Sequence, residues 1–303
     1  KGDAWQAEIS ADGLETAQLK LGRIALSGSG DLTADQGQVG RVGGKIDIST
    51  SGMAFTDASL AQAIGDQISG ALSVDYVEGQ PLDLRDISVR GADFGVTGEA
   101  RIDALSEAFE TEFDIAFSAD NLSRFSAVAG RALSGRAALD LDGTAAPLAG
   151  SFDLNAKGVV TDLDVSQDIA NRLLAGATTL ELSVKRDETG MLLRVLEVEN
   201  PQVDLSAKAR LATEDSEVAF SANLADSSAI SEMLEGPLNV DGTAVQDPRG
   251  WSIDTKAGGP FGAAAEVSGL TTGPDAALEF SADLPNVGVF VPQLPGPLRA
   301  EGQ

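Results

Sequence analysis

The sequence predicts a mainly β protein: an elongated, repetitive β-sheet with a few short helices. The first observation is the alternation in 109–117, where Phe113, Ile115 and Phe117 share one parity and acidic or small residues share the other. Successive side chains of a strand point to opposite faces, so this segment has an apolar face and an acidic face. Secondly, the stretch Phe109–Leu122 ends in Phe117-Ser-Ala-Asp-Asn-Leu122, and this ending returns in similar form from Phe220 and from Phe280. Thirdly, the chain holds 34 glycines but only 5% aromatic residues.

Other alternating segments, bounded by glycines or turn residues such as Glu78–Pro81, predict further strands. We expect them at Leu19–Leu26, near Leu32, and at Lys45–Ser49, Leu72–Tyr76, Leu82–Leu84, Ile87–Val89, Phe94–Val96, Ala100–Ile102, Ala137–Leu141 and Phe152–Leu154.

Three segments have helical spacing instead. In the first, Leu60, Ile64 and Ile68 are four apart, Thr56 or Asp57 can cap the start, and Gly70 follows the expected end. The other two are expected from Leu122 to Ala129, stopping at Gly130, and from Val165 to Leu173, capped by Asp164 or Ser166 and ending at Gly176.

The pattern repeats along the chain. Ala25–Gly28 reappears as Ala132–Gly135, and the strand at Gly44–Ile48 reappears as Gly150–Leu154. We therefore expect approximate units 25–131, 132–232 and a truncated 233–303. No unit is rich enough in large apolar residues to make a convincing core alone, and stacking of repeats compensates for that. We predict one continuous repetitive β array over 1–303, and expect it to be a fragment of a longer protein.

Composition excludes several functions. The chain has no His and no Cys, so imidazole and thiolate catalysis and the usual zinc ligands are absent. The net charge of −26 argues against binding to nucleic acid or directly to an anionic membrane surface. Two Trp and one Tyr are few for a carbohydrate-active cleft. We expect no enzyme activity, no catalytic residues, no cofactor and no metal.

The apolar face has two interpretations. It is either packed against a second layer as a closed dry core, or left open as a groove in a sheet folded like a trough. Acyl chains would suit such a groove, because each buried CH₂ gains roughly 0.8 kcal/mol without a polar partner. The alternation alone favours the dry core.

A resemblance favours the groove. Phe117–Gly130, the run Ala132–Gly158 and the short helices before Leu72-Ser73-Val74 and Leu182-Ser183-Val184 resemble the TamB family. These are inner-membrane-anchored components of the bacterial translocation and assembly module, within the AsmA-like superfamily. The resemblance covers nearly the whole chain but includes no catalytic motif.

What the resemblance implies is a taco-like, β-solenoid-like sheet in the periplasm, with a hydrophobic groove. The implied function is phospholipid transport to the outer membrane and assembly of outer-membrane proteins and autotransporters. Implied partners are phospholipid acyl chains and an outer-membrane TamA-like protein, the latter contacted through regions outside this chain. The alternative is a structural or adhesive secreted β-solenoid with a dry core.

If the groove exists, the inward parity predicts its lining. The expected lining residues are Ile46, Ile48, Val74, Phe109, Phe113, Ile115, Phe117, Leu139, Leu141, Phe152, Leu154, Val184, Val218, Phe220, Leu278 and Phe280.

Overall fold

The structure, a computed structural model, describes residues 2–35, 38–103, 108–146, 148–213, 215–231, 235–289, 293 and 295–303. It divides into two compact units, Lys1–Ser166 (unit 1) and Gln167–Gln303 (unit 2). The three sequence repeats stay a prediction, and their boundary at 232 and 233 lies outside the described residues. The fold is mainly β, as the alternation predicts, with nine described strands in each unit.

Unit 1 contains nine strands and three short helical segments. They are β1 (Asp3–Glu15), β2 (Leu19–Asp35), β3 (Gln38–Phe55), α1 (Ala58–Ile64), β4 (Gln67–Val77), β5 (Leu82–Arg90), β6 (Phe94–Asp103), β7 (Glu110–Ala119), the 3₁₀ helix η1 (Leu122–Phe125), α2 (Ser126–Ala129), β8 (Ser134–Ala146) and β9 (Ser151–Asp164).

Unit 2 also consists of nine described strands with short helical segments, and most of its strands are shorter than those of unit 1. Its elements are α3 (Asp168–Leu173), β10 (Ala177–Asp187), β11 (Gly190–Glu199), β12 (Val203–Leu211), β13 (Glu217–Leu224), η2 (Ser227–Ala229), β14 (Leu238–Asp247), β15 (Gly250–Gly258), η3 (Pro260–Gly262), β16 (Ala264–Leu270), β17 (Ala277–Leu284), η4 (Val287–Val289) and β18 (Leu298–Gly302).

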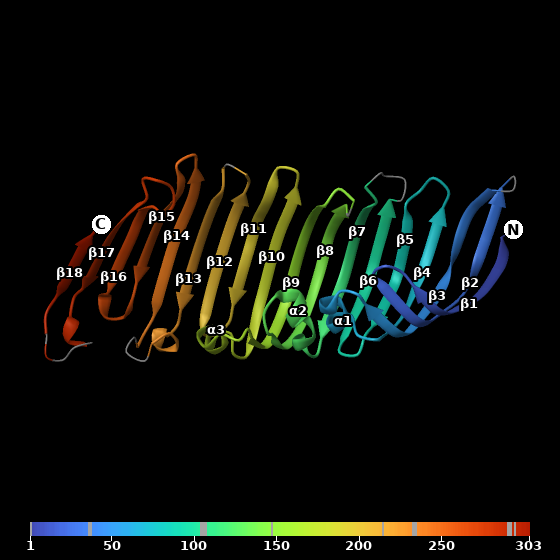
Figure 1. Cartoon of the computed structure of the whole chain (residues 1–303), viewed down its shortest axis with the longest axis horizontal. Helices are drawn as coiled ribbons and strands as arrows, with labels where there is room; N and C mark the ends of the chain where they lie inside the picture. The colour runs from blue at the N-terminus through green and yellow to red at the C-terminus, as the bar shows by residue number, and fades with distance from the viewer. Residues whose placement is uncertain are drawn as a thin grey trace. The chain divides into compact units, whose positions relative to one another are not determined.

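Within each unit, every strand pairs antiparallel with the next strand in the chain. In such a meander, all connections from odd to even strands lie at one end of the strands. The helical segments that the structure describes between strands of a unit all lie in these connections, and α3 leads into β10 from the same end. In unit 1, α1 and α2 accordingly lie together at one end of the strands (Figure 1). We call this the helical end, and the opposite one the turn end.

The strands near the N-terminus are longer than the sequence predicts. The segments around Leu26 and Leu32 form the single strand β2, which continues through Gly28 and Gly30. Strand β1 was not predicted, although Trp5, Ala7 and Ile9 share one parity. In the sequence these glycines indicate the ends of strands, but in the structure they lie inside β2. Gly28 leaves room for a neighbouring side chain, because a Cβ on it would lie 3.0 Å from the Trp5 ring.

The predicted ends of two helices are wrong. Asp57 does cap α1, accepting hydrogen bonds from the amides of Ser59 (2.7 Å) and Leu60 (3.2 Å). The helix, however, stops at Gly65, whose φ of +84° breaks it, and Ile68 lies in β4. Helix α3 begins after Gln167 without a side-chain cap, so neither predicted cap is used. By contrast, the predicted stop at Gly130 is confirmed.

Buried side chains gather at the helical end. In unit 1, Ala63 of α1 is 4% exposed, Ala119 at the end of β7 is 2% exposed, and Ala137 near the start of β8 is 8% exposed. Unit 2 buries five residues at this end, Thr178, Val203, Leu224, Ser227 and Pro260. Most of the buried side chains among the described residues thus lie where helical segments cover the strand ends, whereas Ala156 in β9 and Ser216 before β13 are buried elsewhere.

Candidate apolar binding face

Cross-strand pairing joins the apolar side chains of unit 1 into rows. Antiparallel partners point to the same face, so a chain of partners follows one face across the sheet. One row crosses all nine strands through Ile9, Leu26, Ile48, Gly70, Val89, Val96, Phe117, Leu139 and Gly158. A second runs through Trp5, Gly30, Gly44, Val74, Leu84, Ala100, Phe113, Gly143 and Leu154. Neither row contains a charged residue.

Unit 2 has corresponding rows. One crosses β10 to β18 through Leu182, Leu196, Ala207, Phe220, Gly242, Thr255, Val267, Phe280 and Gly302. Beside it runs the row Val184, Leu193, Ala209, Val218, Ala244, Ile253, Gly269 and Leu278. The hydroxyl of Thr255 is the only polar side-chain group in these two rows. We call the surface made by such rows the apolar face of each unit.

The structure places fifteen of the sixteen residues expected to line a groove on these apolar faces. Ile46, Ile115 and Leu141 lie in the row between the two described for unit 1, and Phe152 is in the next row towards the turn end. The expectation that Phe109 continues the strand is wrong. It lies just before β7 with φ +52° and is 48% exposed.

The apolar faces remain partly open to solvent. Phe113, Phe117 and Leu139 are half-buried, whereas Leu278 and Phe280 are 38% and 48% exposed. In a dry core, large apolar side chains would be sealed by a second packed layer. Among the described residues, the buried apolar side chains are Ala63, Ala119, Ala137, Ala156, Val203, Leu224 and Pro260, none of them aromatic.

On this face, aromatic rings occupy the space that a side chain on a neighbouring glycine would fill. A Cβ on Gly242 would be 2.6 Å from the Phe220 ring, and one on Gly302 would be 2.5 Å from the Phe280 ring. Only a residue without a side chain allows the ring of the neighbouring strand to cover its backbone. The rings therefore add apolar surface at positions where the partner strand has no side chain. Sequence reasoning missed Trp5, which covers Gly44 in the same way.

The opposite face is polar and carries cross-strand ion pairs. Asp75 of β4 accepts from Arg41 Nη2 (2.8 Å) and Arg85 Nη2 (3.2 Å). The hydrogen bonds from Arg41 are the main cause that lowers the pKa of Asp75, against the opposing effect of burial. This charged surface keeps the sheet hydrated on one side while the other side stays apolar.

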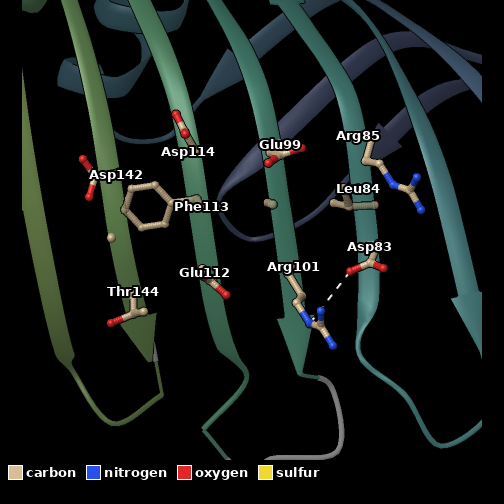
Figure 2. A pocket seen from close by; sticks show the side chains of 12 residues that line it. Asp83, Leu84, Arg85, Glu99, Arg101, Glu112, Phe113, Asp114, Asp142 and Thr144 are labelled. Carbon is tan, nitrogen blue, oxygen red and sulfur yellow. Dashed lines mark ion pairs between the residues drawn. The ribbon is translucent and has the colours of Figure 1, made fainter.

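A hollow on unit 1 contains residues of both faces. It is lined by three consecutive residues from each of β5 to β8, namely Asp83–Arg85, Glu99–Arg101, Glu112–Asp114 and Asp142–Thr144 (Figure 2). Phe113 contributes from the apolar face, while Glu99, Asp114 and Asp142 are cross-strand partners on the polar face. The described residues include no group of three or more acidic side chains placed to hold a metal ion.

Comparison with known proteins gives no relative. No family model, curated protein or solved structure matches the chain. The described helices include none long and apolar enough to cross a membrane. The apolar faces are the site that the geometry itself offers, and their chemistry is the burial of apolar groups.

Proposed function

We propose that this chain is a hydrophobic-groove segment of a TamB- or AsmA-like bridge between bacterial membranes, and that its apolar faces receive phospholipid acyl chains. The observation that carries the proposal is the pair of uncharged rows that cross all nine strands of unit 1 while their large side chains remain partly exposed. Each sheet would curve into a trough around the acyl chain.

The dimensions suit a lipid chain. Neighbouring strands are roughly 4.8 Å apart, so a row across nine strands is about 40 Å long. One leaflet of a bilayer core is about 15 Å thick, half of the ~30 Å total, which is the length of an extended acyl chain. A row is thus longer than its guest. A chain could move along it without meeting a charged side chain.

Binding by an apolar face does not depend on the length of the acyl chain. Burying a methylene group gains roughly 0.8 kcal/mol and requires no matching hydrogen bond. Uncharged rows therefore accept acyl chains of different lengths. The polar headgroup would remain in water beyond the apolar face, and the charge of −26 keeps the other face of the protein soluble.

The wider role rests on the sequence resemblance alone. It comprises a periplasmic location in a protein anchored in the inner membrane, phospholipid transport to the outer membrane, and outer-membrane protein and autotransporter assembly with a TamA-like partner. The alternative is a structural or adhesive secreted β-solenoid with a dry core. The exposure of Leu278 and Phe280 favours the groove over that alternative.

The test is lipid binding by paired variants of one strand. Native mass spectrometry of the parent protein should detect co-purified phospholipid. Phe113→Asp places a carboxylate on the apolar face and should abolish the bound lipid. Ala116→Asp adds the same charge to the opposite face of β7 and should leave it unchanged, since residues 113 and 116 differ in parity.

The folding of these variants separates the groove from a dry core. In a sealed interior, even an unpaired neutral polar group costs several kcal/mol, so Phe113→Asp would unfold the protein. On an open face the carboxylate reaches water, and the variant should stay folded with a modestly lower melting temperature. A parent protein free of lipid, or a Phe113→Asp variant that binds lipid normally, would overturn the proposal.

A further inference from the structure

Two helical segments of unit 1 meet although they are about 60 residues apart in the chain. Helix α1 contacts both η1 and α2, and these three segments together form what we call the cap. Gln62 Nε2 of α1 donates to the carbonyl of Ser123 (3.2 Å), and Arg124 Nη1 donates to the carbonyl of Gln62 (3.2 Å). The cap thus joins the β3–β4 connection to the β7–β8 connection across the helical end.

The cap lies over the end of the apolar face. The Phe125 ring packs edge-on against Phe94 and Phe117, with ring centroids 6.1 and 5.8 Å apart. Phe117 belongs to a row that crosses all nine strands. The cap therefore covers one border of the surface that is open elsewhere.

One arginine holds the cap to the sheet. Arg124 Nη2 and Nε donate to Asp93 Oδ2, at 2.6 and 3.1 Å, and Asp93 lies in the turn between β5 and β6. The Arg124 side chain is only 16% exposed, the least among the arginines of the described ion pairs. Arg124 belongs to η1 and bonds to both α1 and this turn, so it acts as a latch for the cap.

The helices of the cap depend on tertiary contacts. Its helices have seven, four and four residues, lengths at which an isolated helix is unstable in water. Leu60 and Val128 on the cap are 43% and 57% exposed. α1 and α2 end at Gly65 and Gly130, whose φ angles of +84° and +67° mark residues that can serve as hinges.

We propose that the cap is a gate: release of Arg124 from Asp93 lets α1, η1 and α2 swing off the sheet and uncover Phe94 and Phe117 for an apolar ligand. The described residues of unit 2 contain no counterpart of this latch: counted from the N-caps Asn121 and Asp226, Ala229 and Ile230 occupy the positions of Arg124 and Phe125. There, Asn200 Nδ2 holds α3 through a neutral hydrogen bond to the carbonyl of Leu173 (2.8 Å). The gate thus belongs to unit 1.

Hydrogen–deuterium exchange tests the latch without any ligand. In Arg124→Ala, amides of 58–64 and 122–129 should exchange at least tenfold faster, whereas 168–173 should be unchanged. Arg299→Ala removes an exposed ion pair with Asp283 (2.9 Å) and should leave the cap unaffected. Unchanged protection of the cap in Arg124→Ala, or equal loosening in Arg299→Ala, would overturn the proposal.

A reversible lock tests the gate. Because the chain has no Cys, the double variant Gln62→Cys/Ser123→Cys contains only two thiols, and their disulfide ties α1 to η1. An anilinonaphthalene sulfonate dye should bind at least twofold less to the oxidised than to the reduced form, and most to Arg124→Ala. Equal binding by oxidised and reduced forms overturns the gate.

The assignment of a lipid as the ligand of the gate rests on the proposed function, whereas the movement of the cap does not. If fatty acid fails to bind the parent while exchange and dye binding follow the latch, the gate stands and the lipid groove fails. If fatty acid binds equally to the oxidised and reduced double variant, the groove stands and the gate fails.

Discussion

The ring of Phe220 on β13 covers the backbone of Gly242 on β14, so closely that a Cβ at Gly242 would lie 2.6 Å from it. The two residues are cross-strand partners in the main row of unit 2. Phe280 and Gly302 repeat this relationship on the last hairpin. In both pairs, the glycine sets the orientation of the ring.

Gly242→Ala should displace the Phe220 ring. The added methyl group overpacks the site, and we expect a loss of about 1–3 kcal/mol in the free energy of unfolding, measured by urea denaturation. Gly43→Ala is the control, because a Cβ there meets nothing closer than 3.9 Å. Equal stability of the two variants would show that the ring does not need the glycine.

Ala119 and Ala116 test where the sheet is packed. Ala119 lies at the helical end and is 2% exposed. Ala119→Leu overpacks this site and should lower the free energy of unfolding by about 1–3 kcal/mol. Ala116→Leu, on the exposed face of the same strand, should be within about 0.5 kcal/mol of the parent. Thermal unfolding of both compares them; a tolerated Ala119→Leu would mean that this end is open.

Asn121 starts η1 by accepting a hydrogen bond from the amide of Ser123 (3.0 Å). Asn121→Ala should cost about 1 kcal/mol, the usual effect of removing such a cap. Asn121→Asp should be nearly neutral, because Asp226 makes the same bond to Ser228 in unit 2. Chemical denaturation of the two variants checks this, and an equal loss in both would contradict it.

The lowered pKa of Asp187 predicts that the protein loses stability in acid. Hydrogen bonds from the hydroxyl and the amide of Thr189, with a smaller contribution from Lys185, lower its pKa from 3.8 to about 2. A carboxyl whose pKa falls on folding stabilises the protein above its unfolded pKa, and this contribution is lost as the pH falls towards 2. In Asp187→Asn, the melting temperature should therefore decline less between pH 5 and pH 2 than in the parent. A parallel decline would contradict the prediction.

Most residues of the apolar face could be predicted from the sequence. Phe113, Ile115 and Phe117 could be assigned to one face because strand periodicity depends on nothing beyond the strand itself. The same logic assigned Phe220 and Phe280. Their partners could not be foreseen, because cross-strand register depends on turn lengths and bulges, such as the shift between Leu84 and Ile87.

Other features depend on long-range contacts. The pairing of β1 with β2 and the cover that Trp5 gives to Gly44 join segments whose glycines look like chain breaks in the sequence. The end of α1 at Gly65 rather than beyond Ile68 follows from strand pairing of Ile68 with Thr50, which outweighs the helical spacing. The latch between Arg124 and Asp93 has no local signal at all.

The meander connectivity has a consequence for how the protein forms. Within each unit, a strand needs only the strand made just before it, so each sheet can grow hairpin by hairpin as the chain emerges, with low contact order. The cap is the exception, because α1 must wait for residues 122–129. A pulling force applied to one terminus of such a sheet would peel off its hairpins in sequence, giving a series of small force steps rather than a single rupture.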